Sequence, residues 1–448
     1  MSTAVCTDSS GNVYAVGCFY GSVDFDPGIG EHILTTVGDA DAFLCKYDPD
    51  GNFLWAVSWG SSDFDNALAV AAFGDSVYVT GMYFGTIDLD PDPDAADIWP
   101  CMDIADAYVS KFNSSGAYQW GKAFGGTGVD TGLGIVVGHS EAFVEVAGRF
   151  GDTVDFDSSG GVDNHASNGL CDCFLTRLTP SGEYVWTQTW GGTADDLATA
   201  VAVDANDNTY VTSSYRSTVD FDPSISVDSR TSAGDSDVFL TRRDSSGVYV
   251  WTLAWGGSGS EVGTSLAGGK AFNEVWVTGG FTGTVDFDPT VGVDNRTSNG
   301  ANDVFLCGFN SAGTRYFTDT WGGPGADYGY GITYRSDDIL FVTGEFRDEV
   351  DFDPGAGILT RTSNGEVDAF FAALTWNGYL QWAETWGGPG YDRGLSVACL
   401  DVSPKAIFVG GLFMGTVDFN PGPGVDLHSA AGTHEDAFVS RFPEDGQW

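Results

Sequence analysis

The sequence predicts an all-β protein, a seven-bladed β-propeller of four-stranded antiparallel blades, because three series of residues repeat together. Variants of Val-Asp-Phe-Asp-Pro lie 64 to 67 residues apart, and a Trp/Phe-Gly element and an Asp-x-Phe/Tyr element share that spacing. A period this regular is typical of an architecture in which each repeat is one supersecondary unit. The motif begins in repeats one to seven at Val23, Ile87, Val154, Val219, Val285, Val350 and Val417.

Each repeat is expected to hold four strands. Residues 13 to 25 alternate apolar and polar side chains with a period of two, which indicates a strand and not a helix. In repeat four we expect the strands at residues 200–203, 209–221, 237–242 and 249–255. Short Asp/Asn/Ser/Gly turns join the first strand to the second and the third to the fourth, as in hairpins. Four-stranded units repeated in this way predict a propeller, and we prefer it to an open β-solenoid, whose shorter coils need no hairpins.

The whole chain of 448 residues is expected to form one domain. Trp448 falls where a first tryptophan of the last fourth strand belongs, so that strand is expected to be incomplete, either at a frayed seam or because the ring was cut from a longer array. The blades are predicted at about residues 2–60, 66–126, 131–192, 197–257, 262–323, 329–388 and 394–448.

One run of residues resembles a known family. Gly-Asn-Val-Tyr, then Gly-x-Phe-x-Gly-x-Val-Asp-Phe-Asp-Pro, Asp-Ala-Phe-Leu and Trp-Gly-Gly, is similar to the SBBP-type repeat of bacterial and archaeal surface or secreted proteins. The resemblance covers essentially the whole chain. It implies a β-propeller at the cell surface or outside the cell, and it implies no particular activity.

Charge restricts the possible partners. The net charge is −45, from 63 acidic and 18 basic residues, which argues against binding to nucleic-acid phosphates or anionic lipids. No apolar run reaches the roughly 18 residues that a membrane-spanning segment needs, so no membrane insertion is expected. Aspartate outnumbers glutamate 51 to 12. This bias favours turn capping or ligation of hard cations over a halophilic surface, although the low lysine content keeps the halophilic interpretation open.

The motif aspartates are candidate calcium ligands. Aspartates at i and i+2 of an extended strand point the same way, and oxygen-only ligands suit calcium. An acidic residue also follows the Trp-Gly-Gly element, in the loop to the next repeat. We expect this loop on the same side of the blade as the loop that the motif opens, with the acids at Asp63, Asp130, Asp195, Glu261, Asp327 and Asp392. The candidate ligands are Asp24, Asp26, Asp88, Asp90, Asp92, Asp94, Asp155, Asp157, Asp220, Asp222, Asp286, Asp288, Asp351, Asp353 and Asp418.

Turn capping is the competing interpretation of the same residues, because aspartates often bind backbone amides where a strand ends. Repeat two makes the strongest case for calcium, since Asp88, Asp90, Asp92 and Asp94 alternate along one short segment and would repel one another without a cation. Repeat seven has Asn420 in place of the second aspartate, so weaker metal binding is expected there.

Other chemistry-bearing residues do not follow the repeat. Five histidines and eight cysteines recur at no fixed position; Cys6 and Cys18 form the one pair worth testing as a disulfide. The Trp-x-x-x-Trp pairs, such as Trp55 with Trp59, are expected to pack between neighbouring blades.

We therefore expect no enzyme but a non-catalytic extracellular or cell-surface binding or adhesion module that presents its long-loop face to a glycan or protein, with loops stiffened by calcium. Alternatives are a self-assembling subunit of a surface layer or filament and, less favoured, a carbohydrate-active enzyme, because catalytic acid pairs should be exceptions to the repeat.

Overall fold

The computed structural model describes residues 1–269, 273–401, 403, 405–431, 434–444 and 446, and it shows a chain of repeated antiparallel β-sheets. Trp448 lies outside the described residues. The chain divides into two compact units. The N-terminal unit consists of Thr3–Val201 and Thr218–Ser229, and the C-terminal unit consists of Met1–Ser2, Ala202–Ser217 and Arg230–Trp448.

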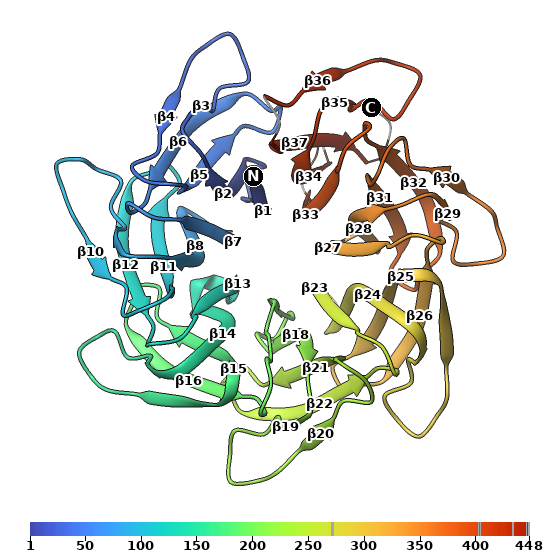
Figure 1. Cartoon of the computed structure of the whole chain (residues 1–448), viewed down its shortest axis with the longest axis horizontal. Helices are drawn as coiled ribbons and strands as arrows, with labels where there is room; N and C mark the ends of the chain where they lie inside the picture. The colour runs from blue at the N-terminus through green and yellow to red at the C-terminus, as the bar shows by residue number, and fades with distance from the viewer. Residues whose placement is uncertain (270–272, 402, 404, 432–433, 445, 447–448) are drawn as a thin grey trace. The chain divides into compact units, whose positions relative to one another are not determined.

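Three four-stranded sheets belong mainly to the N-terminal unit, and each has its strands in sequence order from one edge to the other (Figure 1). Two-stranded hairpins leave two of them, β3 (Ser22–Asp24) with β4 (Ile33–Thr35) and β9 (Thr86–Asp88) with β10 (Ile98–Pro100). A short 3-10 turn, His139–Glu141, lies in the third repeat. The sheets are β1 (Ser2–Thr7), β2 (Val13–Phe19), β5 (Asp41–Tyr47), β6 (Phe53–Trp59); β7 (Asp65–Phe73), β8 (Ser76–Tyr83), β11 (Asp106–Asn113), β12 (Tyr118–Phe124); and β13 (Thr131–Val137), β14 (Val144–Asp155), β15 (Asn164–Leu178), β16 (Tyr184–Trp190).

The C-terminal unit repeats this plan, and its last sheet has three strands among the described residues. Its sheets are formed by β17 (Ala200–Val203), β18 (Thr209–Tyr215), β21 (Asp237–Arg243), β22 (Tyr249–Trp255); β23 (Val262–Gly268), β24 (Glu274–Asp286), β25 (Asn295–Asn310), β26 (Arg315–Trp321); β27 (Tyr328–Arg335), β28 (Ile339–Phe346), β31 (Asp368–Thr375), β32 (Leu380–Trp386); and β33 (Arg393–Leu400), β34 (Ala406–Phe413), β37 (Asp436–Pro443). The shorter hairpin strands of this unit are β29 (Glu349–Asp351), β30 (Thr360–Thr362), β35 (Thr416–Asp418) and β36 (Leu427–Ser429), whereas β19 (Thr218–Asp220) lies in the N-terminal unit and β20 (Ser229–Thr231) begins at its last residue. The predicted all-β class and the four-stranded units are therefore confirmed.

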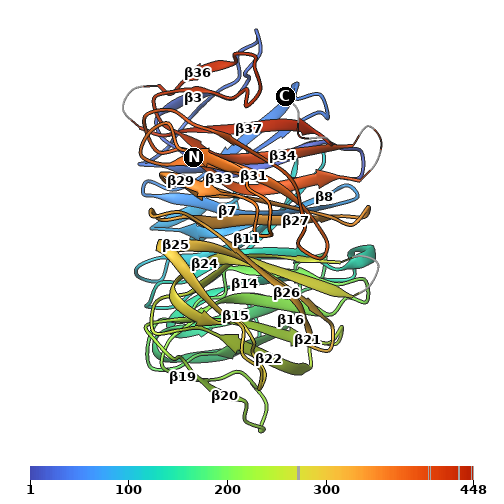
Figure 2. The same cartoon turned by 90° about the vertical axis from the view of Figure 1, so that its right-hand side faces the viewer.

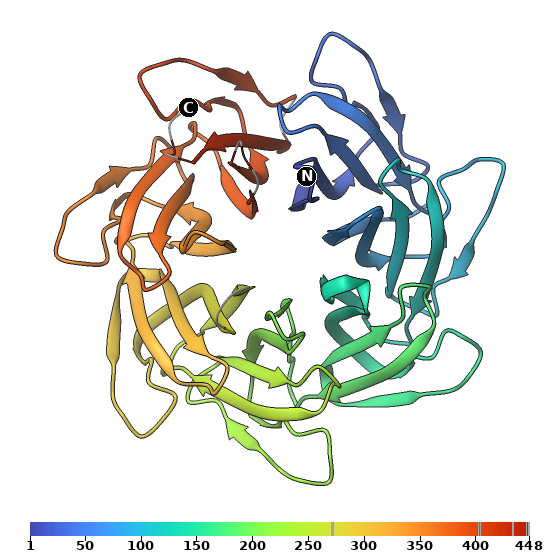
Figure 3. The same ribbon diagram turned by 180° about the vertical axis from the view of Figure 1, so that it is seen from behind.

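The long second strand predicted for each repeat is bent in the structure. In repeat four it divides into β18 and β19, and Ser217 between them has a positive φ of 61°. Gly21, Gly85, Asp152, Gly283, Asp348 and Gly415 hold the same place with positive φ. In repeats three and five, β14 and β24 continue past this residue with a register shift (Figure 2). A residue with a positive φ at this place bends the strand as a bulge does. The motif therefore lies on a hairpin that projects away from its four-stranded sheet, and we call it the outward hairpin (Figure 3).

The apolar residues of the motif anchor each hairpin to its sheet. Val285 and Phe287 are fully buried, and the Phe287 ring lies 5.1 Å from Phe281 and 5.5 Å from Phe305 between ring centroids. Val23, at 36% exposure, is the exception among the motif's first residues. The period-two alternation read from the sequence is thus correct: valine and phenylalanine point into the sheet, and the aspartates point away.

Tryptophans of the fourth strands pack against the following sheet, as predicted. Trp255 lies 5.4 Å from the Phe309 ring, and Trp386 lies 5.4 Å from the Phe442 ring. The first tryptophan of the pair reaches the next hairpin turn, where Trp251 Nε1 donates to the Ser311 carbonyl at 3.1 Å. Both rings are therefore used to join consecutive sheets.

Replacing Trp255 with alanine should lower the free energy of unfolding of the C-terminal unit by about 3–5 kcal/mol, because a buried aromatic contact with Phe305 and Phe309 is lost. Urea titration followed by circular dichroism measures this loss. Val250→Ala, on the exposed side of the same strand, is the matched control. Equal losses in the two variants would contradict the packing role.

Candidate functional site

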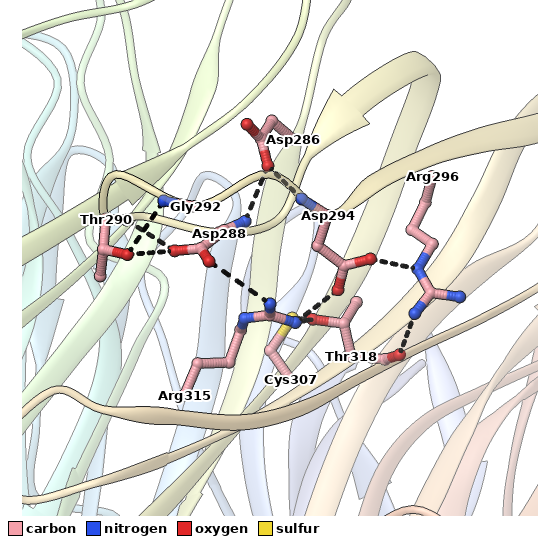
Figure 4. A network of polar contacts seen from close by, with 9 residues as sticks. All are labelled: Asp286, Asp288, Thr290, Gly292, Asp294, Arg296, Cys307, Arg315 and Thr318. Atoms are coloured by element: carbon pink, nitrogen blue, oxygen red, sulfur yellow. Dashed lines mark hydrogen bonds and ion pairs between the residues drawn. The ribbon is translucent and has the colours of Figure 1, made fainter.

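The outward hairpins carry the predicted ligand aspartates, and the first aspartate of each motif closes the hairpin. In repeat five, Asp286 Oδ1 accepts hydrogen bonds from the backbone N–H groups of Asp288 at 3.1 Å and Asp294 at 2.8 Å (Figure 4). One carboxylate oxygen thus fixes both ends of the connecting loop. The same pair of bonds is made by Asp24, Asp88, Asp155, Asp220, Asp351 and Asp418.

The second aspartate makes a smaller turn of its own. Asp288 Oδ1 accepts from Thr290 N at 2.9 Å and from Thr290 Oγ1 at 2.5 Å. Asn420, which replaces this aspartate in repeat seven, makes the equivalent bond to Gly422 N at 2.8 Å. Because an amide oxygen serves as well as a carboxylate here, the turn needs an acceptor and no charge. Equivalent bonds are made by Asp26, Asp90, Asp157, Asp222 and Asp353.

In repeat five, arginine side chains contact the hairpin carboxylates. Arg315 binds Asp294 Oδ2 at 2.5 Å and lies 3.8 Å from Asp288 Oδ2, while Arg296 Nε binds Asp294 Oδ1 at 2.9 Å (Figure 4). In repeats two and three the position of Arg315 is held by Tyr118 and Tyr184, whose hydroxyls donate to Asp97 and Asp163. Arginine therefore supplies in repeat five the positive charge that a cation was expected to supply.

A second series of side chains ties the hairpins to the fourth strands. Arg296 Nη2 donates to the Thr318 carbonyl at 3.3 Å, and Arg230 and Arg361 make the same contact with Thr252 and Ala383 at 3.1 Å. These arginines lie opposite the first residue of the motif in the hairpin register. They bind carbonyls at the outer edge of each sheet, where unpaired backbone groups would recruit other strands.

In repeat two, the run of aspartates from Asp88 to Asp94 has no arginine partner among the described residues. Asp90 Oδ1 accepts from Asp92 N and Asp92 Oδ1 from Asp94 N, both at 3.0 Å, so successive turns follow one another. Burial, followed by the nearby carboxylates of Asp97, Asp90 and Asp88, raises the pKa of Tyr118. Negative charge is thus concentrated at this hairpin.

Across the described ranges of the chain, no group of three or more His, Cys, Asp or Glu side chains has a metal-binding arrangement. The hairpin aspartates and the acids of the loops between repeats do not combine into such a group. Turn capping accounts for the hydrogen bonds that the aspartates of all seven motif copies accept, and calcium binding stays a prediction.

The loop acids between repeats are buried and structural. Asp327 Oδ2 accepts from Gly323 N at 2.7 Å, and its Oδ1 accepts from Arg347 N at 2.8 Å, at the end of the next second strand. Its own N–H donates to the Asn302 carbonyl, so the two long connections do meet on one side as expected. Asp130 and Asp392 repeat the pattern.

In two of these loops, the buried acid is a neighbour of the acid that the sequence indicated. Asp65 and Asp196, not Asp63 and Asp195, hold the buried position, with exposures of 0% each. Both lie six residues after the repeat tryptophan, as Asp130, Glu261, Asp327 and Asp392 lie after theirs or its phenylalanine counterpart. Strict use of that spacing would have identified them.

A second buried acid belongs to the Asp-x-Phe/Tyr element of repeats one to six. It begins the third strand at Asp41, Asp106, Asp237 and Asp368, and it lies inside the longer strands β15 and β25 at Asp172 and Asp303. Asp303 is 1% exposed, and its Oδ2 accepts from Asn299 N at 3.1 Å. Its Oδ1 has no hydrogen-bond partner among the described atoms, as is also true for Asp41, Asp172 and Asp368. A Cβ on Gly322 would lie 2.4 Å from this carboxyl carbon, so glycine in the Trp-Gly element makes room for it.

Burial raises the pKa of the loop acids, to about 7 in Asp130, Glu261 and Asp327 and to about 6 in Asp65. In Asp327 the N–H groups of Gly323 and Arg347 oppose this shift, and the nearby Asp303 and Glu345 add to it. Burial also raises the pKa of Asp303. Burial therefore raises the pKa of both acids in the Asp303–Asp327 pair.

Histidines and cysteines form no joint site. His32 Nε2 contacts the Ala56 carbonyl, and His165 contacts Thr189 and Asp163, all within their own hairpins and sheets. All eight cysteines are free thiols, so the structure does not contain the Cys6–Cys18 disulfide.

No protein-family model matches the chain. The chain is 25% identical over 225 residues to an uncharacterized WD repeat-containing protein of Acanthamoeba polyphaga mimivirus, and 30% identical over 142 residues to regulatory protein FlaEY of Caulobacter vibrioides. These matches cover 43% and 32% of this chain but only 16% and 14% of the two relatives. The fold is propeller-like. Membership of the SBBP-type family stays a prediction.

Two solved structures share a distant likeness. Europium-containing methanol dehydrogenase matches with a TM-score of 0.38 and 10% identity, over 92% of this chain and 84% of that one. Sqt1 from Chaetomium thermophilum matches with a TM-score of 0.34 and 11% identity, over 93% and 80%. Within the described residues no helix has the length and apolarity to cross a membrane.

Replacing Asp351 with alanine should cost about 1–3 kcal/mol of stability, because the N–H groups of Asp353 and Leu359 lose their shared acceptor. Asp351→Asn keeps an acceptor oxygen and should cost less. Thermal unfolding in chelator measures both, with Glu349→Ala on the same hairpin strand as the control. If asparagine were as damaging as alanine in chelator, the capping interpretation would be wrong.

The buried loop acids should make the protein more stable at mildly acidic than at neutral pH. A carboxyl whose pKa is raised by folding stabilises the folded state fully below its unfolded value, near 4, and loses that contribution as the pH rises to the folded value. The melting temperature should therefore fall between about pH 4.5 and 7, in line with the pKa of about 7 at Asp327. Asp327→Asn should flatten this slope, whereas Asp353→Asn on an exposed turn should not. A melting temperature that rises over this range would contradict the assignment.

Proposed function

We propose that the chain is a non-catalytic binding or adhesion module, displayed outside the cell or on its surface, that presents its hairpins to a glycan or protein. We also propose that its seven motif copies correspond to seven blades. The carrying observation is the contrast within each hairpin between a fixed base and an exposed apolar tip. Val285 and Phe287 are buried, whereas Val291 at the tip is 104% exposed.

The exposed tips recur from repeat to repeat. Ile29, Val162, Ile225, Ile358 and Val425 are 72% or more exposed at the corresponding turns. A capped turn holds each tip in place, which lowers the ordering cost of binding. Within each compact unit, several weak contacts of this kind add up when neighbouring hairpins bind the same ligand. Repeat two differs, because its tip carries the acidic run instead.

Calcium is proposed as the ion that stiffens these hairpins, with the segment from Asp88 to Asp94 as its best site. Four aspartates lie close along this segment, and no basic side chain contacts them in the part of the chain that is described. Repeat five is the least suited to calcium, since Arg315 already contacts Asp288 and Asp294.

Calcium should raise the melting temperature relative to chelator, and Asp90→Asn with Asp92→Asn should reduce the increase. Differential scanning calorimetry measures both, with Asp50→Asn on an exposed turn outside the hairpins as the control. An unchanged transition in wild type would exclude calcium as a stiffening ion.

Recognition is tested separately on glycan arrays and protein arrays with Val291→Ser and Ile358→Ser. Loss of binding in these variants supports the proposed function. Ordered self-association of wild type without glycan or protein binding would favour the assembly role instead.

A further inference from the structure

Repeat six departs from the others where its first two strands pair. Tyr328 of β27 lies opposite Glu345 of β28 in the strand register. The same register position holds Asn66 with Met82, Thr131 with Arg149, Val262 with Gly280 and Arg393 with Leu412 in other repeats. Because those pairs support the same sheet, the fold itself does not require a tyrosine and a glutamate here.

Two tyrosines of β27 form a stacked pair. The rings of Tyr328 and Tyr330 lie 5.8 Å apart at an angle of 10°, and both side chains are partly exposed. The register shifts between Gly329 and Gly331, so Tyr330 sits on a bulge, a device that re-aims side chains. A Cβ on Gly280 of the preceding sheet would lie 2.5 Å from the Tyr328 ring, so glycine there leaves space for it.

Two charged groups complete the cluster, Glu345 of the same sheet and Arg393 of the next sheet. Tyr330 Oη donates to Glu345 Oε1 at 3.0 Å, and Arg393 of β33 pairs through Nε with Glu345 Oε2. The Glu345 residue is 5% exposed, whereas the Arg393 side chain is 33% exposed. Because Arg393 pairs with Glu345 through Nε, other N–H donors of its partly exposed guanidinium can reach a ligand.

A third tyrosine lies beside this guanidinium. Arg393 is 5.7 Å from the Tyr391 ring centroid, and Tyr391 is 36% exposed. Glu366, which hydrogen-bonds Tyr391 and raises its pKa, also lies 3.8 Å from Arg347. Aromatic faces, a fork of donors and carboxylate acceptors are thus within one small region of the C-terminal unit.

The cluster is poorly explained by stability alone. Burying a carboxylate against a partly exposed arginine is a weak source of stability, since desolvation offsets the attraction. The exposed part of the Tyr391 side chain adds nothing to the core. Such groups are typical of recognition sites, where rings supply contact area and forked donors supply specificity.

We propose that Tyr328, Tyr330, Tyr391, Glu345 and Arg393 form a binding site for a neutral pyranose sugar. The C–H face of a pyranose packs on an aromatic ring, and adjacent hydroxyls match the donors of Arg393 and the acceptor oxygens of the carboxylates. A neutral sugar fits better than an anion, because Glu345 already balances the charge of Arg393 and the chain carries a net charge of −45.

Saturation-transfer difference NMR tests this with the methyl glycosides of glucose, galactose, mannose and N-acetylglucosamine, and with sodium acetate as the anionic probe. At least one glycoside should bind the full chain. Arg393→Met should weaken that binding about tenfold or more, as expected for lost hydrogen bonds to a charged donor. Arg393→Lys should restore it only in part, because an ammonium lacks the fork. Arg361→Met, on a hairpin of the same unit, should leave binding unchanged.

Tyr391→Ala provides a second variant, in which the exposed ring is removed and the Glu345–Arg393 pair is kept. It should also weaken glycoside binding, with an unchanged melting temperature. Binding of acetate alone, or of no glycoside, would overturn the inference.

This inference rests on the proposed binding function, and the two can fail separately. If hairpin-tip variants lose array binding while Arg393→Met does not lose glycoside binding, the module binds ligands and the assigned sugar site is wrong. If Arg393→Met and Tyr391→Ala lose glycoside binding while the tip variants keep array binding, the sugar site is correct and the hairpins are not the recognition surface.

Discussion

The buried acid in the loop before each of repeats two to seven makes the contacts on which the rest of the structure depends. Asp327 joins three backbone segments, since it accepts from Gly323 and Arg347 and donates its own N–H to Asn302. One residue thereby fixes the end of a fourth strand and the base of the next hairpin through its carboxylate, and the preceding third strand through its backbone N–H. The carboxylate accepts from backbone N–H groups, so the contact resembles a polar cap more than a salt bridge. Part of the acidic composition is therefore internal, since these loop acids are buried.

The period and the strand order could be predicted from the sequence because they depend on side-chain alternation. Residues 249–255 and 200–203 were predicted with the bounds that β22 and β17 have. The bend before the motif could not be predicted at Asp152, Ser217 or Asp348, since these residue types adopt a positive φ less often than glycine does. Sequence alternation continues through a bulge of this kind, so two strands appeared as one.

The position of the candidate site could be predicted from the sequence, but what its aspartates bind could not. Aspartates two residues apart on a strand have the same pattern whether they bind a cation or backbone amides. The contacts in the structure distinguish the two interpretations. Asn420 makes the same bond as the aspartates at its position, which shows that an uncharged acceptor suffices for the turn. Arg315 could not be recognised as a partner of Asp288 and Asp294 either, because it follows them by more than twenty residues and replaces a tyrosine of other repeats.

An internal repeat provides its own comparison, and that comparison separates the requirements of the fold from those of function. Positions that keep one residue type in every copy, such as the first motif aspartate, are explained by backbone bonds that every copy makes. Where the residue type differs from repeat to repeat, the sheet does not require any one type. A buried charged residue at such a position therefore needs an explanation other than the fold. Glu345 and Arg393 meet this condition, since other repeats place methionine, glycine or asparagine at the same points of the register. Residues that depart from the repeat therefore indicate function better than the repeated aspartates, which the fold explains.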